Sequence, residues 1–430
     1  MTTRGDAIAA PNGSNAIARR DAMDDAEARA VKRAYRLARD GIASMVERYF
    51  QTNAAAHAAC VELLKVSGAD LEAYASPDAV AREIPLDHLA FRSFAMDDFG
   101  VDGVCDTFEA AGYSTVSEEE GPGAVLEFPE KRVRARWMRP PRTPDGEVPL
   151  PRIFVSELVV DACEPELRDM LKEVLSRVRE GKVLQSGEWA DGRNARWQLP
   201  TASTYARVER LSEYASWTLL HGYAVNHAAV SLFQLRKKFP DTPARSLQDV
   251  ESVFAGHHAL SRKRWNDAGG RIKRSPSGLL LQSSLMSVKH TFKLYKKTEK
   301  IVDRYGAETM DPKFKEYNLP GSYIEFVERL PRPENAEKAF EDLEEVDLRD
   351  GFETGNASKI FESTSTRILS GADQVGAAPG AAPGAAPTRG VEQQRKFKPS
   401  SMAPTVARAA SEGRGAQAPA GAADDVIDLT

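Results

Sequence analysis

The sequence has 430 residues, which is enough for two or three domain-sized units with hydrophobic cores. Hydrophobic residues make up 42% and charged residues 28%, as in an ordinary globular protein, and a net charge of −5 gives no overall attraction to nucleic acid or to an anionic membrane. No apolar run approaches the roughly 18 residues that cross a bilayer. We therefore expect a protein that binds neither nucleic acid nor membrane. The sequence has three cysteines, Cys60, Cys105 and Cys163. Their spacing does not fit a zinc site and their number does not fit a disulfide scaffold, so we expect a reducing compartment and a protein that is not secreted.

The N-terminal region divides into a polar start and a helical segment. Residues 1–24 are rich in Ala and are predicted to be disordered. Asp6 and Asp21 count against an organelle transit peptide, so the cytoplasm and the plastid both stay open as compartments. Residues 25–84 are predicted to be helical, because apolar residues recur every three or four positions from 26 to 50 and a second helical pattern follows. We expect this segment to supply packing rather than a site.

The next stretch, residues 85–94 (PLDHLAFRSF), is predicted to be a strand. Side chains alternate between the two faces of a strand, so His88, Ala90 and Arg92 share one face. An imidazole and a guanidinium on one face could hold a metal ion and the far end of a small diacid. The alternative is a structural histidine whose ring nitrogens form ordinary hydrogen bonds within a half-buried strand.

This strand opens a predicted first module at residues 85–163. A helix that ends near Gly112 follows it. Two strands at 124–128 and 133–138 then read as a hairpin, and a strand rich in β-branched residues covers 153–160. The resulting order is one strand, one helix and three strands.

The order recurs in a predicted second module at residues 221–370, after a helical and loop-rich connector at 164–220. A strand at 222–232 carries His227, and the last strand, at 321–330, carries Glu325. Each module therefore opens with a histidine strand and closes with a glutamate strand, which indicates an internal duplication. A helix and a further strand are predicted between them, at 246–256 and 278–288.

Two charged stretches and a low-complexity tail complete the chain. Residues 262–300 are basic and residues 334–353 are acidic, and both are interpreted as solvated faces that attract each other. Residues 371–430 lack the apolar side chains needed to fold and are predicted to be a disordered tail. The final seven residues, 424–430, have the pattern of a short docking segment.

Three residues from separate predicted strands form a candidate metal site: His88, His227 and Glu325. Two imidazoles and one carboxylate on one side of a metal ion are typical of non-haem Fe(II) oxygenases, in which the other side stays open for substrate and O₂. Two alternatives remain, with His221 in place of His227 and Glu157 in place of Glu325. The other histidines are interpreted as surface or structural: His57, His257, His258 and His290.

Three motifs together resemble the 2-oxoadipate dioxygenase/decarboxylase family of the vicinal oxygen chelate superfamily. They are LDHLAFRSF at 86–94, LHGYAVNH at 220–227 and GSYIEFVER at 321–329, and RDGFETGNASKIFEST at 349–364 is similar to the plant and algal branch. The resemblance spans roughly residues 30 to 368. It implies an α+β fold in which two βαβββ modules curl into a barrel-like cavity that holds one Fe(II).

By this resemblance His88, His227 and Glu325 correspond to the iron ligands and Arg92 to a substrate-binding, catalytic arginine. The implied reaction converts 2-oxoadipate and O₂ into 2-hydroxyglutarate and CO₂ in lysine breakdown, so the expected partners are a 2-oxo diacid and O₂. A planar guanidinium can hold a carboxylate through two parallel N–H···O bonds. If His221 is not a metal ligand, we expect it to contact one of the ligand residues or the substrate.

Alternatives to this assignment stay open. Arg92 could instead form a structural ion pair with Asp87, Glu157 or another buried acid. The same scaffold could carry a different metal-dependent reaction. A third possibility is a non-catalytic plastid or scaffold protein that binds a polyanion through residues 262–300. The sequence predicts no particular oligomeric state.

Overall fold

The computed structural model describes the chain between residues 13 and 354. The stretches left out within this range are 71–75, 97–99, 121–122, 177–196, 258–259, 261–264, 266–270, 287–288, 303–307 and 321. The predicted tail at 371–430, with its docking segment, and the predicted disorder of residues 1–12 therefore lie outside the described residues.

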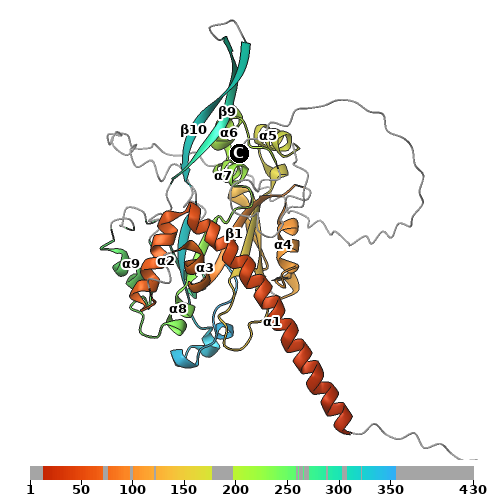
Figure 1. Cartoon of the computed structure of the whole chain (residues 1–430), viewed down its shortest axis with the longest axis vertical. Coiled ribbons are helices and arrows are strands. Elements are labelled where there is room, and N and C mark those ends of the chain that lie inside the picture. Colours follow the sequence, from red (N-terminus) through yellow and green to blue (C-terminus); the bar gives the residue numbers. More distant parts are fainter. Residues whose placement is uncertain are drawn as a thin grey trace, which may run out of the picture. The chain divides into compact units, whose positions relative to one another are not determined.

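Helices and strands follow one another along most of the described chain (Figure 1). The helices are α1 (Gly13–Thr52), α2 (Ala54–Val66), α3 (Pro77–Glu83), α4 (Val101–Glu109), α5 (Pro165–Ser176), α6 (Ala202–Leu211), α7 (Glu213–His221), α8 (Leu232–Lys238) and α9 (Leu247–Phe254). The strands are β1 (Leu86–Phe94), β2 (Ser114–Thr115), β3 (Val125–Phe128), β4 (Val133–Arg139), β5 (Arg152–Leu158), β6 (His227–Ser231), β7 (Lys273–Arg274), β8 (Leu280–Met286), β9 (Lys289–Val302), β10 (Glu308–Pro320) and β11 (Tyr323–Arg329). Within the described part of the chain, no helix is both long and apolar enough to span a lipid bilayer.

Nine of the described strands form one mixed sheet in the order β2-β4-β5-β1-β6-β11-β8-β7, with β3 also paired to β4. In each half the opening strand pairs in parallel with the closing strand, β1 with β5 and β6 with β11, and the halves join through an antiparallel pairing of β1 with β6. The predicted α+β class is confirmed as a mixed sheet flanked by helices. The barrel-like closure is not confirmed: the end strands β2 and β7 have two residues each and do not pair with one another in the described chain.

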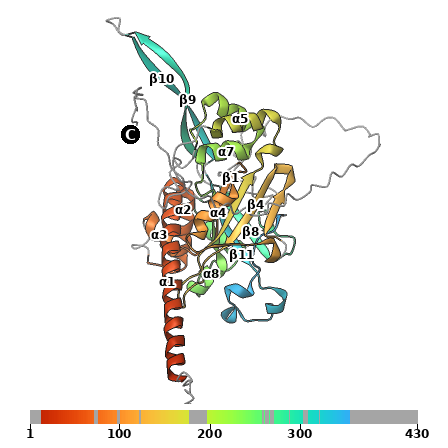
Figure 2. The same cartoon turned by 90° about the vertical axis from the view of Figure 1, so that its right-hand side faces the viewer.

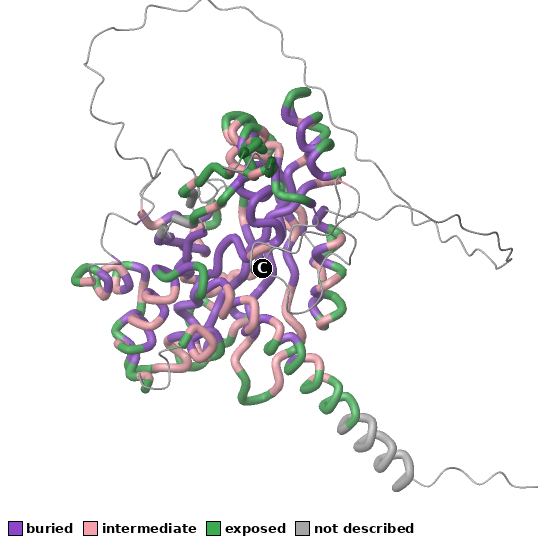
Figure 3. Tube along the Cα trace, turned by 45° about the horizontal axis from the view of Figure 1, so that its top comes forward, coloured by how far each residue is buried: buried purple, intermediate pink, exposed green. Residues whose placement is uncertain are grey.

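Strand β1 is buried on both faces, and different helices cover the two faces. On one face, the ring of Phe91 packs 5.4 Å from that of Phe108 on α4. On the other face, the guanidinium carbon of Arg92 lies 4.7 Å from the ring centre of Tyr214 on α7. Figure 3 shows the buried residues gathered in the central strands and the helix faces beside them. Water is therefore excluded from the face of β1 that carries His88 and Arg92.

Helix α1 confirms the predicted amphipathic pattern, since its buried residues recur every three or four positions: Tyr35, Ala38, Ile42, Val46 and Tyr49. The hydroxyl of Tyr49 donates to the carbonyl of Tyr323 at 2.6 Å and ties the helix to β11. The helix begins at Gly13, within the N-terminal segment. An Ala-rich stretch with no proline after Pro11 has high helix propensity, which extends the helix toward the N-terminus.

The predicted strand at 222–232 is shorter in the structure, where β6 covers only His227–Ser231. Gly222 ends helix α7 with a φ of 57°, a conformation that favours glycine. At the other end, Ser231 accepts a hydrogen bond from the backbone N–H of Gln234 and caps α8. His227 is therefore the first residue of its strand rather than a central one.

The C-terminal part of the basic stretch lies in β9, which pairs with β10 to form a separate two-stranded sheet (Figure 2). One end of this two-stranded sheet packs on α6, through contact of Leu294 with Tyr205. Lysines along this sheet pair with nearby acids, as in Lys293 with Glu316 at 3.4 Å and Lys300 with Glu308 at 2.5 Å. These exposed pairs agree with a solvated face, although Lys273 in the same stretch is buried.

The acidic stretch does not form only a solvated face, so that interpretation is wrong for part of it. Glu345 and Asp350 contact the guanidinium of Arg152 on β5 at 3.0 and 2.8 Å. Asp350 also accepts a hydrogen bond from Arg139 at 3.0 Å. The stretch therefore folds back onto the main sheet, because the buried guanidinium of Arg152 needs carboxylate partners.

This contact predicts a pH-dependent stability. Burial alone would raise the pKa of Asp350, but Arg152 and Arg139 lower it from 3.8 to about 2. A carboxyl with a depressed pKa stabilises the folded state above its unfolded pKa, and that contribution disappears as the pH falls toward its folded pKa. Urea unfolding of the wild type and of Asp350→Asn should therefore differ at pH 7, and the difference should shrink below about pH 4. A difference that stays constant down to pH 3 would contradict this assignment.

Candidate metal centre

Strand register brings the three predicted metal ligands to one face of the sheet. His88 on β1 lies opposite Ala229 on β6, and Ala229 lies opposite Glu325 on β11. His227 on β6 lies opposite Ala90 on β1. Two alanines therefore occupy the positions between the larger side chains, and their small size leaves room for three ligand groups to converge.

The ligand atoms of these residues lie close together. His88 Nε2 is 3.3 Å from His227 Nε2, and Glu325 places Oε2 3.6 Å from His88 Nε2 and Oε1 3.6 Å from His227 Nε2. Two atoms bound at about 2.1 Å to one ion lie roughly 3.0 to 3.5 Å apart, so these spacings fit a single metal ion. Among the histidine, cysteine and acidic side chains of the described residues, this group of three has the spacing needed to bind a metal ion.

The electrostatics of the group also fit a cation. Burial raises the pKa of Glu325 to about 8, although a hydrogen bond from Gln282 to Oε2 at 2.8 Å partly opposes this. The other carboxylate oxygen, Oε1, is buried and has no hydrogen-bond partner. Burial lowers the pKa of His88 and of His227, so both imidazoles are held neutral, the form that binds metals. A divalent ion would satisfy the orphaned oxygen and offset the cost of burying the carboxylate.

Arg92 lies beside this group on the same face of β1. Its guanidinium carbon is 5.0 Å from the ring centre of Trp217, and Nη1 is 3.5 Å from Oε1 of Glu213. The positive charge of Arg92 is close enough to lower the pKa of His227, after the larger effect of burial. Glu213 is a partner that the sequence did not identify, since it lies on helix α7 rather than on a neighbouring strand.

His221, the alternative ligand, is the last residue of α7 and lies outside the converging group. Its ring stacks on Trp217 at 4.3 Å and meets the edge of Phe292 at 5.0 Å. The sequence suggested a strand edge for His221, and the early end of the predicted strand explains the difference.

Glu157, the alternative carboxylate, faces the opposite side of the sheet. It lies opposite Ser93 on the face covered by α4, where its Oε2 accepts a hydrogen bond from the N–H of Val101 at 2.7 Å. By strand register the first-half equivalent of Glu325 is Phe154, because His88 lies opposite Arg152 and His227 opposite Tyr323. The closing strand of the first half therefore carries no second carboxylate on this face.

Sequence reasoning missed three polar residues that contact the ligands. Gln282 donates to Glu325, whereas Asp87 and Asn226 each bond the Nδ1 of the histidine that follows them, at 2.8 and 3.0 Å. The sequence does contain a signal for Asp87 and Asn226, since each of them immediately precedes a candidate ligand histidine. Gln282 had no such signal, because its place depends on the pairing of β8 with β11.

A substitution at the small residue between the ligands tests the metal position. Ala229→Leu should weaken metal binding by more than about tenfold, because the larger side chain would enter the space between His88 and Glu325. Ala229→Ser is the matched control and should bind metal like the wild type. Chelator competition on both folded apoproteins measures this, and wild-type affinity in Ala229→Leu would place the ion elsewhere.

A mixed sheet that buries two neutral imidazoles and one carboxylate around a single position defines a mononuclear metal-dependent enzyme. The family described as 2-oxoadipate dioxygenase/decarboxylase matches residues 42–314. The chain belongs to this family, as its motifs indicated, and is therefore an oxidoreductase. The alternative of a non-catalytic scaffold that binds a polyanion is not supported.

Similar proteins agree with this assignment. The chain is 34% identical over 297 residues to the chloroplastic 2-oxoadipate dioxygenase/decarboxylase of Arabidopsis thaliana, covering 67% of this chain and 70% of the relative. It is 35% identical over 292 residues to the chloroplastic/amyloplastic protein of the same name from Oryza sativa subsp. japonica, covering 66% and 70%. The crystal structure of the Oryza sativa hydroxyglutarate synthase in complex with 2-oxoadipate superposes with a TM-score of 0.59 at 31% identity, covering 79% of this chain and 95% of that one.

Proposed function

We propose that the chain binds one Fe(II) through His88, His227 and Glu325 and converts 2-oxoadipate and O₂ into 2-hydroxyglutarate and CO₂. The observation that carries this proposal is the convergence of three buried side chains, whose ligand atoms all lie within 4.8 Å of one another. The reaction balances without another reductant, because both atoms of O₂ enter the products while one carbon leaves as CO₂. Fe(II) would supply Lewis acidity toward the 2-oxo acid and the electrons that activate O₂.

Arg92 is the residue that we assign to a substrate carboxylate. It is buried beside the ligand group, and a guanidinium in such a place offers two parallel donors to an anion. Tyr214 and Trp217 pack against it and restrict its orientation. Glu213, half-buried and 3.5 Å away, would compensate its charge when no substrate is bound.

His221 is assigned to the substrate side of the site. Its ring stacks on Trp217, and the same indole packs against Arg92. This shared contact supports a position for His221 beside the substrate rather than on the metal. His221→Ala should therefore raise the KM for 2-oxoadipate while it leaves the iron content unchanged.

The two halves of the sheet are assigned to two modules of the vicinal oxygen chelate type, at residues 85–163 and 221–370. The support is the repeated pairing of an opening strand in parallel with a closing strand, seen for β1 with β5 and for β6 with β11. We also propose the plastid as the compartment, since both plant relatives carry plastid names. Imaging of the full chain fused to a fluorescent protein would test this, and a purely cytoplasmic signal would contradict it.

Removal of a metal ligand should abolish turnover and iron binding together. His88→Ala, His227→Ala and Glu325→Ala each delete one of three ligands, and iron analysis after anaerobic loading should fall well below one atom per chain. Glu157→Gln and His221→Ala are the matched controls and should keep about one iron per chain. Full iron content in any ligand variant would remove that residue from the set.

Arg92→Lys should keep iron and lose most activity, because lysine retains the charge without the planar pair of donors. The expected loss is about 2–4 kcal/mol in kcat/KM, measured by O₂ uptake with 2-oxoadipate. Glu213→Gln is the control: it removes the carboxylate next to Arg92 and should not raise the KM. Near-normal kinetics in the iron-loaded lysine variant would make Arg92 a structural residue.

A further inference from the structure

The two histidines of the site are held in the same way by the residue that precedes each of them. His88 Nδ1 lies 2.8 Å from Oδ1 of Asp87, and His227 Nδ1 lies 3.0 Å from Oδ1 of Asn226. An ionised carboxylate or an amide oxygen can only accept a hydrogen bond, so each Nδ1 carries the proton. The unprotonated Nε2 of each ring is then the atom that faces the converging group.

Neighbouring residues of a regular strand point to opposite faces, so the contact between Asp87 and His88 needs a local distortion. The pairing of β1 with β6 shifts register between Leu86 and His88, as in a β-bulge. Asn226 precedes β6, and its backbone N–H donates to the carbonyl of Ala90 at 2.8 Å. Two different backbone arrangements therefore produce the same contact to a histidine.

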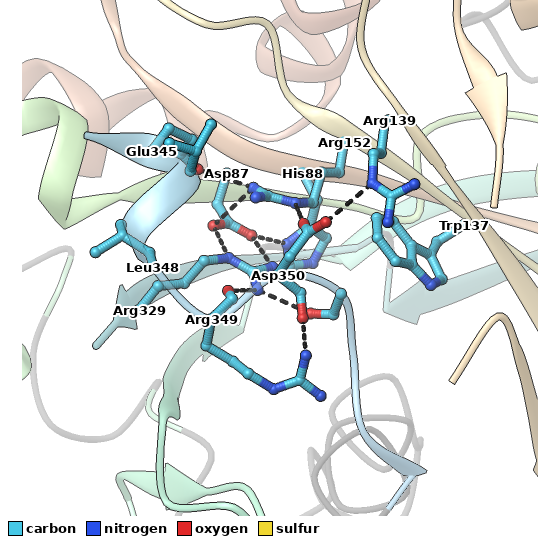
Figure 4. Close-up of polar contacts among 12 residues, drawn as sticks. Asp87, His88, Trp137, Arg139, Arg152, Arg329, Glu345, Leu348, Arg349 and Asp350 are labelled. Atoms are coloured by element: carbon cyan, nitrogen blue, oxygen red, sulfur yellow. Dashed lines mark hydrogen bonds and ion pairs between the residues drawn. The ribbon is translucent and has the colours of Figure 1, made fainter. Parts of the chain in front are cut away.

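The partners of the two histidines differ in charge: Asp87 is a carboxylate whose charge is compensated by arginines, and Asn226 is a neutral amide. Asp87 accepts two hydrogen bonds from Arg329, at 2.6 and 2.9 Å, and lies 3.8 Å from Arg152 (Figure 4). Two buried guanidinium groups next to one buried carboxylate compensate its charge, and the two bonds from Arg329 fix its orientation. The carboxylate next to His88 is therefore charged and fixed in orientation, whereas the partner of His227 is a neutral amide.

The end of the described chain closes over this pair. Nη1 of Arg329 donates to the backbone carbonyls of Arg349 and Gly351 at 2.9 and 2.8 Å. The ring of Phe352 meets His88 edge-on, with ring centres 5.0 Å apart. Gly351 has a φ of 75°, and a Cβ there would lie 2.9 Å from the indole of Trp137, so only glycine suits this turn.

We propose that Asp87 is a positioning residue: clamped by Arg329, it holds the imidazole of His88 in the Nδ1–H form with Nε2 aimed at the metal position. This inference rests on the proposed metal site and adds a requirement to it. The strength of metal binding depends on a charged partner for one histidine and a neutral partner for the other.

The decisive comparison is between Asp87→Asn and Asp350→Asn. Both variants remove one charge from carboxylates that contact arginines in the same region, but Asp350 touches Arg139 and Arg152 rather than a ligand histidine. The apoproteins are titrated with Co(II) in competition with a chelator, well below their melting temperatures. The visible absorption of bound Co(II) reports the ligand environment independently of turnover.

Asp87→Asn should bind Co(II) about 10- to 100-fold more weakly than the wild type and should change its absorption spectrum. Asp350→Asn should lose stability but bind with an affinity within about threefold of the wild type and with an unchanged spectrum, since no ligand contact is lost. Wild-type affinity in Asp87→Asn, or an equal loss in both variants, would overturn the proposal. A wild-type chain that binds no Co(II) would instead refute the metal site itself.

A double variant covers the case in which Asp87→Asn fails to fold because Arg329 is left buried and unpaired. Asp87→Asn/Arg329→Gln removes both charges and keeps a polar side chain near the carbonyls of Arg349 and Gly351. It should fold and show the same 10- to 100-fold loss of Co(II) affinity, about that of the single change. Tight binding by the folded double variant would overturn the role of Asp87.

Discussion

The antiparallel pairing of β1 with β6 is the constraint on which the site depends. It joins the two halves of the sheet and sets His88 opposite Ala229 and His227 opposite Ala90. Because side chains alternate along a strand, a slip of one residue would turn a histidine toward the face that packs on α4. The burial of Phe91 against Phe108 on that other face opposes such a slip, so core packing fixes the register that the metal ligands require.

The sequence singled out three residues that converge in the structure, but it did not identify most of the residues around them. Alternation along 85–94 and the family resemblance were enough to single out His88 and Arg92, and β1 has nearly the expected bounds. The choice between Glu325 and Glu157 stayed open, because the face of a closing strand depends on its pairing with an opening strand far away in the sequence. Gln282 was missed for the same reason, and the early end of the strand before His227 depends on a helix stop at Gly222.

Charge counting misjudged the acidic stretch for a different physical reason. A run of acids next to few bases reads as solvated when only neighbours in the sequence are considered. In the folded chain its partners are arginines on β4 and β5, Arg139 and Arg152, which are nearly 200 residues or more away. Arg152 is buried on its strand and requires such partners, so an acidic segment far away in the sequence packs against it.

Phe154 has a consequence for the evolution and the charge of the site. If the two halves descend from one duplicated unit, a fully symmetric arrangement would offer two histidines and two carboxylates around the same axis. Phe154 stands where the second carboxylate would be, and its ring packs 5.0 Å from Phe352. A divalent ion held by two neutral histidines and one carboxylate would keep one net positive charge, which would attract an anionic substrate. It would also have fewer protein ligands, so coordination positions would stay open. Divergence between the two halves would have created both properties.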